Sequence, residues 1–490
     1  MRSAVSVVPG LSVVVEDKVS EVTNDEWQGK SVLVLGLGDT GLSSVRWLAA
    51  HGAHVRAADT RAAPPALGAL RAEHPAVAVS LGVFDAALLE GVDTVLASPG
   101  IALREPVLRA ALGRGIEVVG DVEVFARELR RRGKGRVLGI TGTNGKSTVT
   151  ALAGAMGRAA GYRTIVAGNI GLPVLDALDS AEAANAELYV IELSSYQLET
   201  TSSLVLDAAA MLNLTQDHMD RYDSMADYAA AKKGIFRHAA TRVVNRDDPW
   251  SRAMAGADAF SFGLGIPHGG REWGLDSSST RLRRGDKDLI ALDEMAMTGL
   301  HNAANAMAAH ALLCAIDAPQ APLAQALREF KGLPHRVELV AEASGVRFYD
   351  DSKGTNVGAT VAALEGFRTP VVLIAGGDGK GQDFSPLVPA VRTRARALVL
   401  IGRDAPAIAA SLASADVALH RAGTMEEAVE AAFALASPGD AVLLSPACAS
   451  FDMFRNYHHR GEVFAAAARA IASGTGHTSK PDVPCPPKAH

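Results

Sequence analysis

A segment near residue 140 requires a strand, a tight turn and a helix in immediate succession. The apolar run at residues 137–140 stops at the turn Gly142-Thr-Asn-Gly-Lys-Ser-Thr148, and a helical stretch follows through residue 160. Units of this kind build parallel α/β sheets, in which helices cover both faces of buried strands. The free N–H groups and the positive dipole end at the start of such a helix attract an anion.

The residue types in this turn indicate a nucleoside triphosphate as the anion. Lys146 is long enough to reach the outer phosphates, and the hydroxyls of Ser147 and Thr148 suit a phosphate-bound Mg²⁺. The spacing departs from the usual phosphate-binding loop, because Ile140 stands where its first glycine would fall. The alternative is a strand–turn–helix connection with an incidental Gly-Lys pair. The candidate nucleotide-binding residues here are Gly142, Thr143, Asn144, Gly145, Lys146, Ser147 and Thr148.

Short apolar runs alternate with helical stretches over most of the 490 residues, which is too long a chain for one core. This alternation predicts an α/β protein with three domains, each around a doubly wound, mainly parallel sheet. Polar, alternating pieces at 258–295 predict a small antiparallel excursion, and an Arg/Gly-rich hinge is expected at 130–136. The predicted segments are a disordered extension (1–28), a Rossmann-like domain (29–126), a central P-loop domain (127–332), a C-terminal Rossmann-like domain (333–473) and a disordered tail (474–490).

Composition restricts the cellular compartment and the kinds of partner that we expect for the protein. The net charge of −6 argues against a nucleic-acid partner, which needs a basic face. Cys314, Cys448 and Cys485 have no metal-ligand spacing and cannot form a disulfide framework, so a reducing cytoplasm is expected. No apolar run approaches the roughly 18–20 residues of a membrane span.

The first domain begins with a second glycine turn, Gly36-Leu-Gly-Asp-Thr-Gly41, after a buried strand. Asp59 follows at the next strand end, where a dinucleotide fold places a ribose-binding acid. This geometry fits an NAD-dependent dehydrogenase, and it also fits the diphosphate of a UDP-sugar.

Polar residues near the central sheet are candidates for the same site. Glu192 ends a strand, where a carboxylate can meet phosphate-bound Mg²⁺, and His218 follows another strand at the same edge. Asn302 and Asn305 lie three apart on a helix, so both amides can address one planar base. The pair Lys232-Lys233 alone indicates two solvated side chains.

The third domain contains three strands that end in small, polar or basic loops: Asp350-Asp-Ser-Lys-Gly-Thr-Asn356, Gly376-Gly-Asp-Gly-Lys-Gly381 and Ser445-Pro-Ala-Cys-Ala-Ser-Phe451. We expect all three loops to open at one edge of a sheet. Their lysines and hydroxyls predict a pocket for a small ligand with several negative charges.

Together these segments resemble the Mur ligase family of peptidoglycan synthesis over about residues 30–472. The Asp-Ser-Lys and Ser-Pro-Ala-Cys-Ala-Ser elements favour its D-glutamate-adding member. The matching motifs, in order, are Gly142-Thr-Asn-Gly-Lys-Ser-Thr148, Gly168-Asn-Ile-Gly171, Glu192-Leu-Ser-Ser-Tyr-Gln-Leu-Glu199, Asp217-His-Met-Asp-Arg-Tyr222, Leu333-Pro-His-Arg336, Asp351-Ser-Lys-Gly-Thr-Asn356 and Ser445-Pro-Ala-Cys-Ala-Ser450.

The resemblance implies a role for each matching residue. Asp39, Thr40, Asp59, Thr60, Arg61 and Asn169 would bind the UDP-sugar, with Asn169 on its muramoyl part. Lys146, Ser147, Thr148, Asn302, Asn305, Arg336 and Asp351 would bind ATP. Ser147, Thr148, Glu192, His218 and a carbamylated Lys232 would hold two Mg²⁺ ions, and Lys146, Glu192, His218 and Lys232 would be catalytic. Lys353, Thr355, Lys380, Ser450, Phe451 and Tyr457 would form the D-glutamate pocket.

The implied reaction is an ATP-dependent amide ligation in the cytoplasm, through an acyl phosphate, by a monomer without membrane insertion. Its substrates would be UDP-N-acetylmuramoyl-L-alanine, D-glutamate and ATP. Two alternatives stay open. A folate-polyglutamating ligase would not need the first glycine turn, and an NAD-dependent dehydrogenase would leave the turn at Lys146 without a role.

Overall fold

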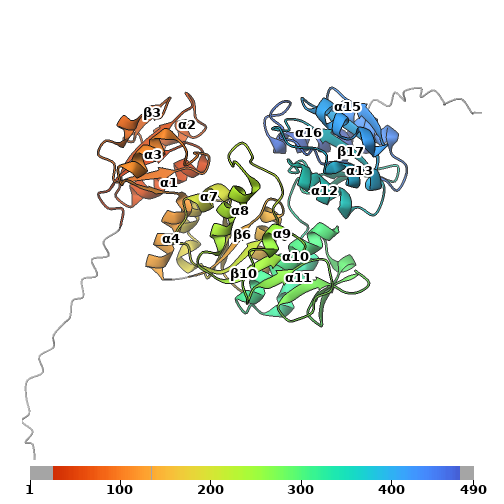
Figure 1. Ribbon diagram of the computed structural model, residues 1–490, viewed down its shortest axis with the longest axis horizontal. Coiled ribbons are helices and arrows are strands. Elements are labelled where there is room, and N and C mark those ends of the chain that lie inside the picture. Colours follow the sequence, from red (N-terminus) through yellow and green to blue (C-terminus); the bar gives the residue numbers. More distant parts are fainter. Residues whose placement is uncertain (1–25, 134, 475–490) are drawn as a thin grey trace, which may run out of the picture.

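The computed structural model describes residues 26–133 and 135–474, which form three α/β units. The N-terminal and C-terminal units lie on either side of the central one (Figure 1). The predictions of disorder for the two tails fall mainly outside these residues. Residues 26–28, which we assigned to the extension, form a turn, and Trp27 is buried with its ring centroid 6.2 Å from that of Trp47.

The N-terminal unit is a parallel sheet of order β3-β2-β1-β4-β5. Strand β1 is central because its residues 32–35 are buried on both faces of the sheet. The strand order reverses at β1, so the turn after it lies at the switch point where α/β sheets bind ligands. The elements are β1 (Ser31–Leu35), α1 (Asp39–Ala50), β2 (His54–Asp59), α2 (Leu67–Glu73), β3 (Ala78–Leu81), β4 (Thr94–Ala97), α3 (Pro106–Gly113) and β5 (Glu117–Val119).

The central unit has nine strands in the order β14-β13-β12-β11-β10-β9-β6-β8-β7. Strands β12 to β14 are antiparallel, which confirms the excursion expected at 258–295. Its strands are β6 (Arg136–Thr141), β7 (Thr164–Gly168), β8 (Leu188–Glu192), β9 (Leu206–Met211), β10 (Ala239–Asn245), β11 (Phe260–Phe262), β12 (Glu272–Leu275), β13 (Arg281–Arg284) and β14 (Lys287–Ala291). Its helices are α5 (Lys146–Ala159), α6 (Val174–Asp179), α7 (Ser195–Glu199), α8 (Met225–Lys233), α9 (Pro249–Arg252), α10 (Leu300–Ala315) and α11 (Gln320–Glu329).

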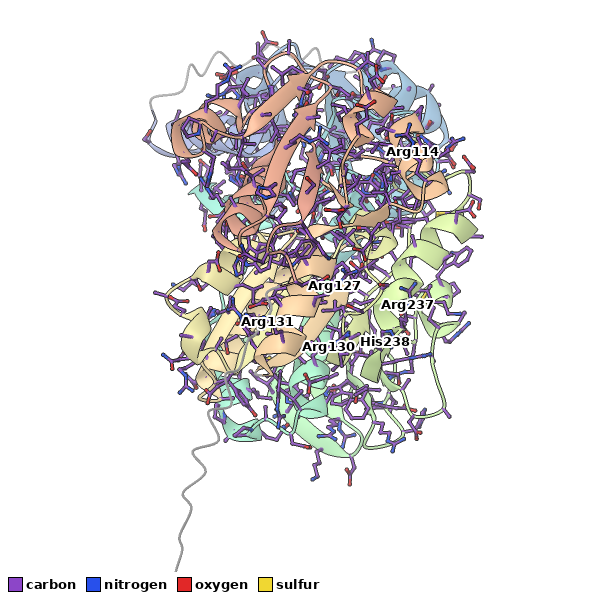
Figure 2. The ribbon with its side chains drawn as sticks, turned by 90° about the vertical axis from the view of Figure 1, so that its left-hand side faces the viewer. Arg114, Arg127, Arg130, Arg131, Arg237 and His238 are labelled. Atoms are coloured by element: carbon purple, nitrogen blue, oxygen red, sulfur yellow. The ribbon has the colours of Figure 1, made fainter. Side chains whose placement is uncertain are left out.

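Helix α4 (Asp121–Arg132) joins the first two units and packs against α6. The hinge predicted at 130–136 is therefore wrong for its first three residues, which end this helix. Arg130 donates to the carbonyl of Ser203 at 2.6 Å, and Arg237 donates to that of Thr201 at 2.9 Å. Both arginines and His238 lie on one face of the molecule in Figure 2, at the loop after α7. No helix in the described ranges is both long and apolar enough to cross a membrane.

The C-terminal unit is a six-stranded sheet of order β15-β16-β20-β17-β18-β19, parallel except for β15. Strands β16, β20 and β17 are neighbours, so the loops that follow them open at one edge, as predicted. The strands are β15 (Glu338–Ala343), β16 (Val346–Asp350), β17 (Val371–Gly376), β18 (Ala395–Ile401), β19 (Ala418–Arg421) and β20 (Ala441–Leu444). The helices are α12 (Val357–Gly366), α13 (Leu387–Arg394), α14 (Ala405–Ser411), α15 (Met425–Leu435) and α16 (Tyr457–Ala472).

Candidate active site

A cavity of about 560 Å³ lies where the central and C-terminal units face each other. The central unit contributes the turn before α5, Asn169 after β7, Glu192 at the end of β8 and the loop 216–220 after β9. The C-terminal unit contributes Lys353, Lys380 and their neighbours. Side chains from two sheet edges therefore converge on one space, which is large enough for a small-molecule site.

The turn before α5 has the backbone that a phosphate loop requires. Gly142 and Gly145 have φ values of 154° and 83°, a region that residues with a Cβ rarely adopt. Lys146 lies at the first position of α5, and its Nζ donates to the carbonyl of Thr143 at 2.7 Å. Burial lowers the pKa of Lys146. An anion in the cavity would offer this ammonium a stronger partner than a carbonyl.

One buried side chain, Glu192, lies at the floor of the cavity near Lys146, and the exposed Asn169 holds it. Glu192 accepts a hydrogen bond from Asn169 Nδ2 at 3.0 Å through Oε1, whereas its buried Oε2 has no partner among the described residues. A buried carboxylate oxygen without a donor is costly. Its position at the end of β8, close to the phosphate loop, is the one expected of a ligand for phosphate-bound Mg²⁺.

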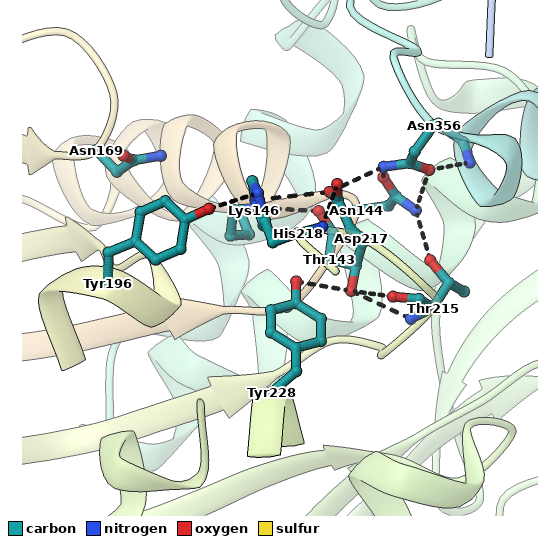
Figure 3. Close-up of polar contacts among 12 residues, drawn as sticks. Thr143, Asn144, Lys146, Asn169, Tyr196, Thr215, Asp217, His218, Tyr228 and Asn356 are labelled. Atoms are coloured by element: carbon teal, nitrogen blue, oxygen red, sulfur yellow. Dashed lines mark hydrogen bonds and ion pairs between the residues drawn. The ribbon is translucent and has the colours of Figure 1, made fainter. Parts of the chain in front are cut away.

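His218 is held in an unusual conformation beside this floor. Its φ of 58° is rare for a residue with a side chain, and such strain persists where the surroundings impose it. Its carbonyl accepts from the N–H groups of Arg221 and Tyr222 at 2.9 and 3.1 Å. Its Nδ1 lies 2.7 Å from the hydroxyl of Tyr196 (Figure 3). The Arg221 guanidinium stacks on the ring of Tyr196, 4.1 Å from its centre. Burial lowers the pKa of His218, which favours the neutral ring that metals bind.

The prediction that Lys232 and Lys233 are both solvated is wrong for Lys232. Lys233 is exposed, but Lys232 is only 2% exposed and lies behind the phosphate turn. Its Nζ donates to the carbonyl of Gly142 at 2.8 Å and to Thr141 Oγ1 at 3.3 Å. Burial places the pKa of Lys232 well below its ordinary value. The packing of α8 against the turn decides this burial, which the sequence could not show.

A second cavity of about 270 Å³ adjoins the other side of the turn. Asn302 and Asn305 line it together, and Asn305 Nδ2 donates to Asn302 Oδ1 at 3.2 Å. Thr148, Arg336 and Asp351 complete the candidate nucleotide residues in its wall. Arg336 spans the two units, because it also donates to Ser147 Oγ at 2.7 Å. Burial raises the pKa of Asp351 to about 7.

Four of the six candidate D-glutamate residues line the larger cavity, namely Lys353, Thr355, Lys380 and Tyr457. Lys353 Nζ lies 3.7 Å from the centre of the Tyr457 ring, and burial lowers the pKa of Lys353 to about 8. Ser450 and Phe451 are absent from the cavity wall. Ser450 is buried, and its carbonyl accepts from the N–H groups of residues 453 and 454, whereas Phe451 is 71% exposed.

The candidate UDP-sugar residues of the N-terminal unit line neither cavity. Asp39 and Thr40 begin α1, and Thr60 and Arg61 follow β2. Asp59 is already engaged: it accepts from the N–H of Leu37 at 2.7 Å and from the guanidinium and N–H of Arg61. These bonds, chiefly that from the Arg61 side chain, lower the pKa of Asp59 to about 2. Asp59 thus stabilises the glycine turn by accepting a hydrogen bond from the N–H of Leu37.

The sequence interpretation missed several residues of the larger cavity: Gln216, Asp217, Asn356, Gln382 and His458. Asp217 and Asn356 stand inside the motifs quoted above, next to residues that were chosen. A polar residue beside a chosen one at a strand end was the available signal. Gln382 and His458 do not directly follow a strand end. Gln382 reaches the cavity through the folding of its loop, and His458 through the placement of the first turn of α16.

Three family models cover the described units in order. "Mur ligase MurD-like, N-terminal domain" matches residues 30–120, "Mur ligase middle domain" matches 140–313, and "Mur ligase, glutamate ligase domain" matches 335–448. The chain belongs to the Mur ligase family. The glutamate-ligase model spans the C-terminal lysines that face the phosphate turn of this Mur ligase.

Curated relatives agree with this assignment. The chain is 56% identical over 439 residues to the UDP-N-acetylmuramoylalanine–D-glutamate ligase of Methylobacillus flagellatus, which covers 89% of this Mur ligase and 96% of the relative. It is 55% identical over 454 residues to the enzyme of that name from Nitrosospira multiformis, covering 91% and 96%.

Solved structures share the fold at low sequence identity. The UDP-N-acetylmuramate–alanine ligase of Thermotoga maritima has a TM-score of 0.56 at 19% identity, with 90% of this Mur ligase and 99% of that chain covered. MurF from Acinetobacter baumannii has a TM-score of 0.57 at 16% identity, covering 91% and 92%. The three-unit architecture is therefore that of Mur ligases.

Proposed function

We propose that this Mur ligase uses ATP to join D-glutamate to UDP-N-acetylmuramoyl-L-alanine in the synthesis of peptidoglycan precursors. The observation that supports it most is one cavity with the phosphate turn on one wall and Lys353 and Lys380 on the other. A triphosphate and a dicarboxylate can therefore meet there. The names of the relatives contain UDP-N-acetylmuramoylalanine and D-glutamate.

The reaction follows from the chemistry of these walls. A carboxylate oxygen of the L-alanine residue attacks the γ-phosphorus of ATP, ADP departs, and an acyl phosphate forms. The amine of D-glutamate then attacks the acyl carbon and loses a proton, and inorganic phosphate leaves with the oxygen that had joined carbon to phosphorus. Lys146 would stabilise charge on the transferred phosphoryl group, and Lys353 and Lys380 would hold the glutamate carboxylates. Asn302 and Asn305 would bind the adenine in the second cavity.

The residues beside the phosphate turn fit Mg²⁺. The partnerless, buried Oε2 of Glu192 and the hydroxyls of Ser147 and Thr148 are oxygen ligands of the kind this ion prefers. When bound, Mg²⁺ would neutralise phosphate charge and polarise the phosphoryl oxygens. We propose two ions, the second of them near His218.

Lys232 is proposed to act as a carbamate. Its burial favours the neutral amine, which can add to the carbon of CO₂ and release a proton. The product is an anion that would bind a metal beside the phosphate turn. Its formation would remove the present bond from Nζ to the Gly142 carbonyl.

The N-terminal unit is proposed to hold the UDP part of the substrate at its switch point, through Asp39, Thr40, Asp59, Thr60 and Arg61. Asn169 would contact the muramoyl part at the entrance of the larger cavity. Because both walls of the larger cavity come from one chain, we propose a monomer, and the resemblance implies that it works in the cytoplasm.

Parallel assays test the function. Purified protein is incubated with ATP and Mg²⁺ plus either UDP-N-acetylmuramoyl-L-alanine and D-glutamate, or a folate and L-glutamate, and separately with NAD⁺ and candidate alcohols. We expect ADP release only in the first mixture, together with a product one glutamate heavier. Activity confined to the folate mixture, or NADH formation alone, would refute the proposal.

Lys146→Ala tests the phosphate turn on its own. The variant removes the charge nearest the outer phosphates, so turnover should fall roughly 10²-fold or more. Thermal unfolding serves as the control and should match the wild type, because among the described residues the ammonium donates only to a carbonyl of its own loop. Turnover near the wild-type rate in a folded variant would remove Lys146 from the site.

A further inference from the structure

The start of helix α12 makes a polar contact with the central unit. Asn356 caps this helix, since its Oδ1 accepts from the N–H of Ala359 at 2.8 Å. The same side chain exchanges two hydrogen bonds with Asn144 of the phosphate turn, at 3.1 and 3.3 Å. Its Nδ2 also donates to Asp217 Oδ2 at 3.3 Å, and the network is visible in Figure 3.

Gly358, two residues further on, makes this contact sterically possible. A Cβ at this position would lie 2.7 Å from Thr215 Oγ1 and 3.1 Å from Thr215 Cβ. The backbone of Gly358 does not require glycine, because its φ is not positive. Glycine is less stable than alanine inside a helix. Its absence of a side chain therefore serves the close approach of the two units.

The surface that receives α12 is itself tied to the phosphate turn. Thr215 donates its N–H to Thr143 Oγ1 at 3.1 Å, and Thr143 Oγ1 lies 3.2 Å from the carbonyl of Thr215. Asn144 Nδ2 lies 3.4 Å from Thr215 Oγ1. A rigid connection thus runs from the residues that would hold ATP to the helix that follows Thr355.

We infer that Asn356 and Gly358 are positioning residues for the ligase reaction. They dock the start of α12 onto the phosphate turn and so fix the distance between the D-glutamate loop and the acyl phosphate. The inference rests on the proposed function. Lys353 and Thr355 precede the contact by one to three residues, so a shift of α12 moves them directly. A misplacement of about 1 Å between reacting groups can cost on the order of 10²-fold in rate.

The variant Gly358→Ala distinguishes an effect on the docking of the two units from an effect on folding. The added methyl group suits the helix but meets Thr215, so the variant should unfold at the wild-type temperature or above it. The radius of gyration from small-angle X-ray scattering should increase, and kcat/KM for D-glutamate should fall at least 10-fold. Gly68→Ala in α2 is the matched control, because nothing lies within 4 Å of a Cβ there. Wild-type compactness and kinetics in Gly358→Ala would refute the role of Gly358.

Substitutions at Asn356 separate capping from docking. Asp and Ser both cap helices as well as Asn does. Asp places a carboxylate beside Asp217, whereas Ser only removes the bonds between units. We expect kcat/KM for D-glutamate to decrease in the order Asn, Ser, Asp, and the Asp variant to be the most expanded. Asn456→Asp, the same change at the exposed cap of α16, should leave compactness unchanged.

The two proposals fail in different ways. If the wild type does not ligate D-glutamate, the proposed function fails, while scattering on the variants still tests the docking contact. If the wild type is active and both Asn356→Asp and Gly358→Ala keep its compactness and kinetics, the contact is incidental and the inference is wrong.

Discussion

Two adjacent lysines differ completely in their surroundings although they share one turn of α8. Lys233 is solvated, whereas Lys232 is enclosed between the Tyr228 ring, 4.9 Å away, and the carbonyl of Gly142. Only the enclosed amine loses the solvation that keeps a lysine charged. The chemistry we propose for Lys232 therefore depends on its burial.

Lys232→Ala should be nearly inactive, because it removes the group that would be converted into a metal-binding anion. A small carboxylate such as formate or acetate should restore part of the activity by occupying the vacated space. Lys233→Ala is the matched control and should keep wild-type activity with no response to carboxylate. Full activity of Lys232→Ala without an additive would exclude the carbamate.

The pKa of Lys353, lowered to about 8 by burial, predicts a pH dependence. Below pH 8 the side chain is an ammonium that holds a carboxylate, and above pH 8 it loses its charge. Arginine stays charged in this range, and it can stack on Tyr457 as the lysine does. The ratio of kcat/KM for D-glutamate between wild type and Lys353→Arg should fall up to tenfold per pH unit above 8. A constant ratio from pH 7 to 10 would contradict the lowered pKa.

At the level of elements, the glycine turn after β1 depends on the close packing of α1. A Cβ on Gly41 would lie 1.9 Å from the carbonyl oxygen of Gly36, and this contact joins two backbone segments that cannot swing away. Around Gly38, in contrast, nothing lies within 4 Å of a Cβ. The third glycine of the turn is therefore fixed by packing, and the second has room for a side chain.

Gly41→Ala should lower the free energy of unfolding by about 1–3 kcal/mol, the usual cost of overpacking. Gly38→Ala should lower it by only about 0.5 kcal/mol, because alanine is a poorer N-cap than glycine but meets no clash here. Denaturant unfolding of both variants measures the difference. Equal stability of the two would show that the turn relaxes around the added methyl group.

At the scale of the whole molecule, we propose that specificity for D-glutamate arises from the way the central and C-terminal units face each other. Lys353 and Lys380 come from loops after different strands, and both face the phosphate turn across the larger cavity. An acceptor held at two carboxylates has only one orientation of its amine relative to the acyl phosphate. Chirality is then selected by the separation of the loops.

D-glutamate should be ligated at least about 10²-fold faster than L-glutamate, because inversion at the α-carbon turns the amine away. D-aspartate is one methylene shorter and should bind poorly, since only one carboxylate reaches a lysine. Lys380→Ala should raise the KM for D-glutamate much more than the KM for ATP. Steady-state kinetics with the three amino acids check this, and equal turnover of the glutamate enantiomers would refute the two-point pocket.

Much of the fold follows from local patterns. The apolar runs at 94–97, 117–119 and 441–444 predict strands with those bounds, and β4, β5 and β20 have them. Strands β15 and β19 were not predicted, because they lie at the edges of their sheet and are largely exposed. An edge strand with polar residues carries little of the apolar signal that marks a buried one.

The sequence by itself determined the three α/β units, the phosphate turn and the polar loops at strand ends, because each is encoded by neighbouring residues. Only the tertiary structure decided which of those loops share a cavity. It buried Lys232, left Phe451 on the surface and brought Asn356 to the phosphate turn. These outcomes depend on contacts between residues far apart in the chain. The packing of whole elements determines such contacts, and no local pattern describes that packing.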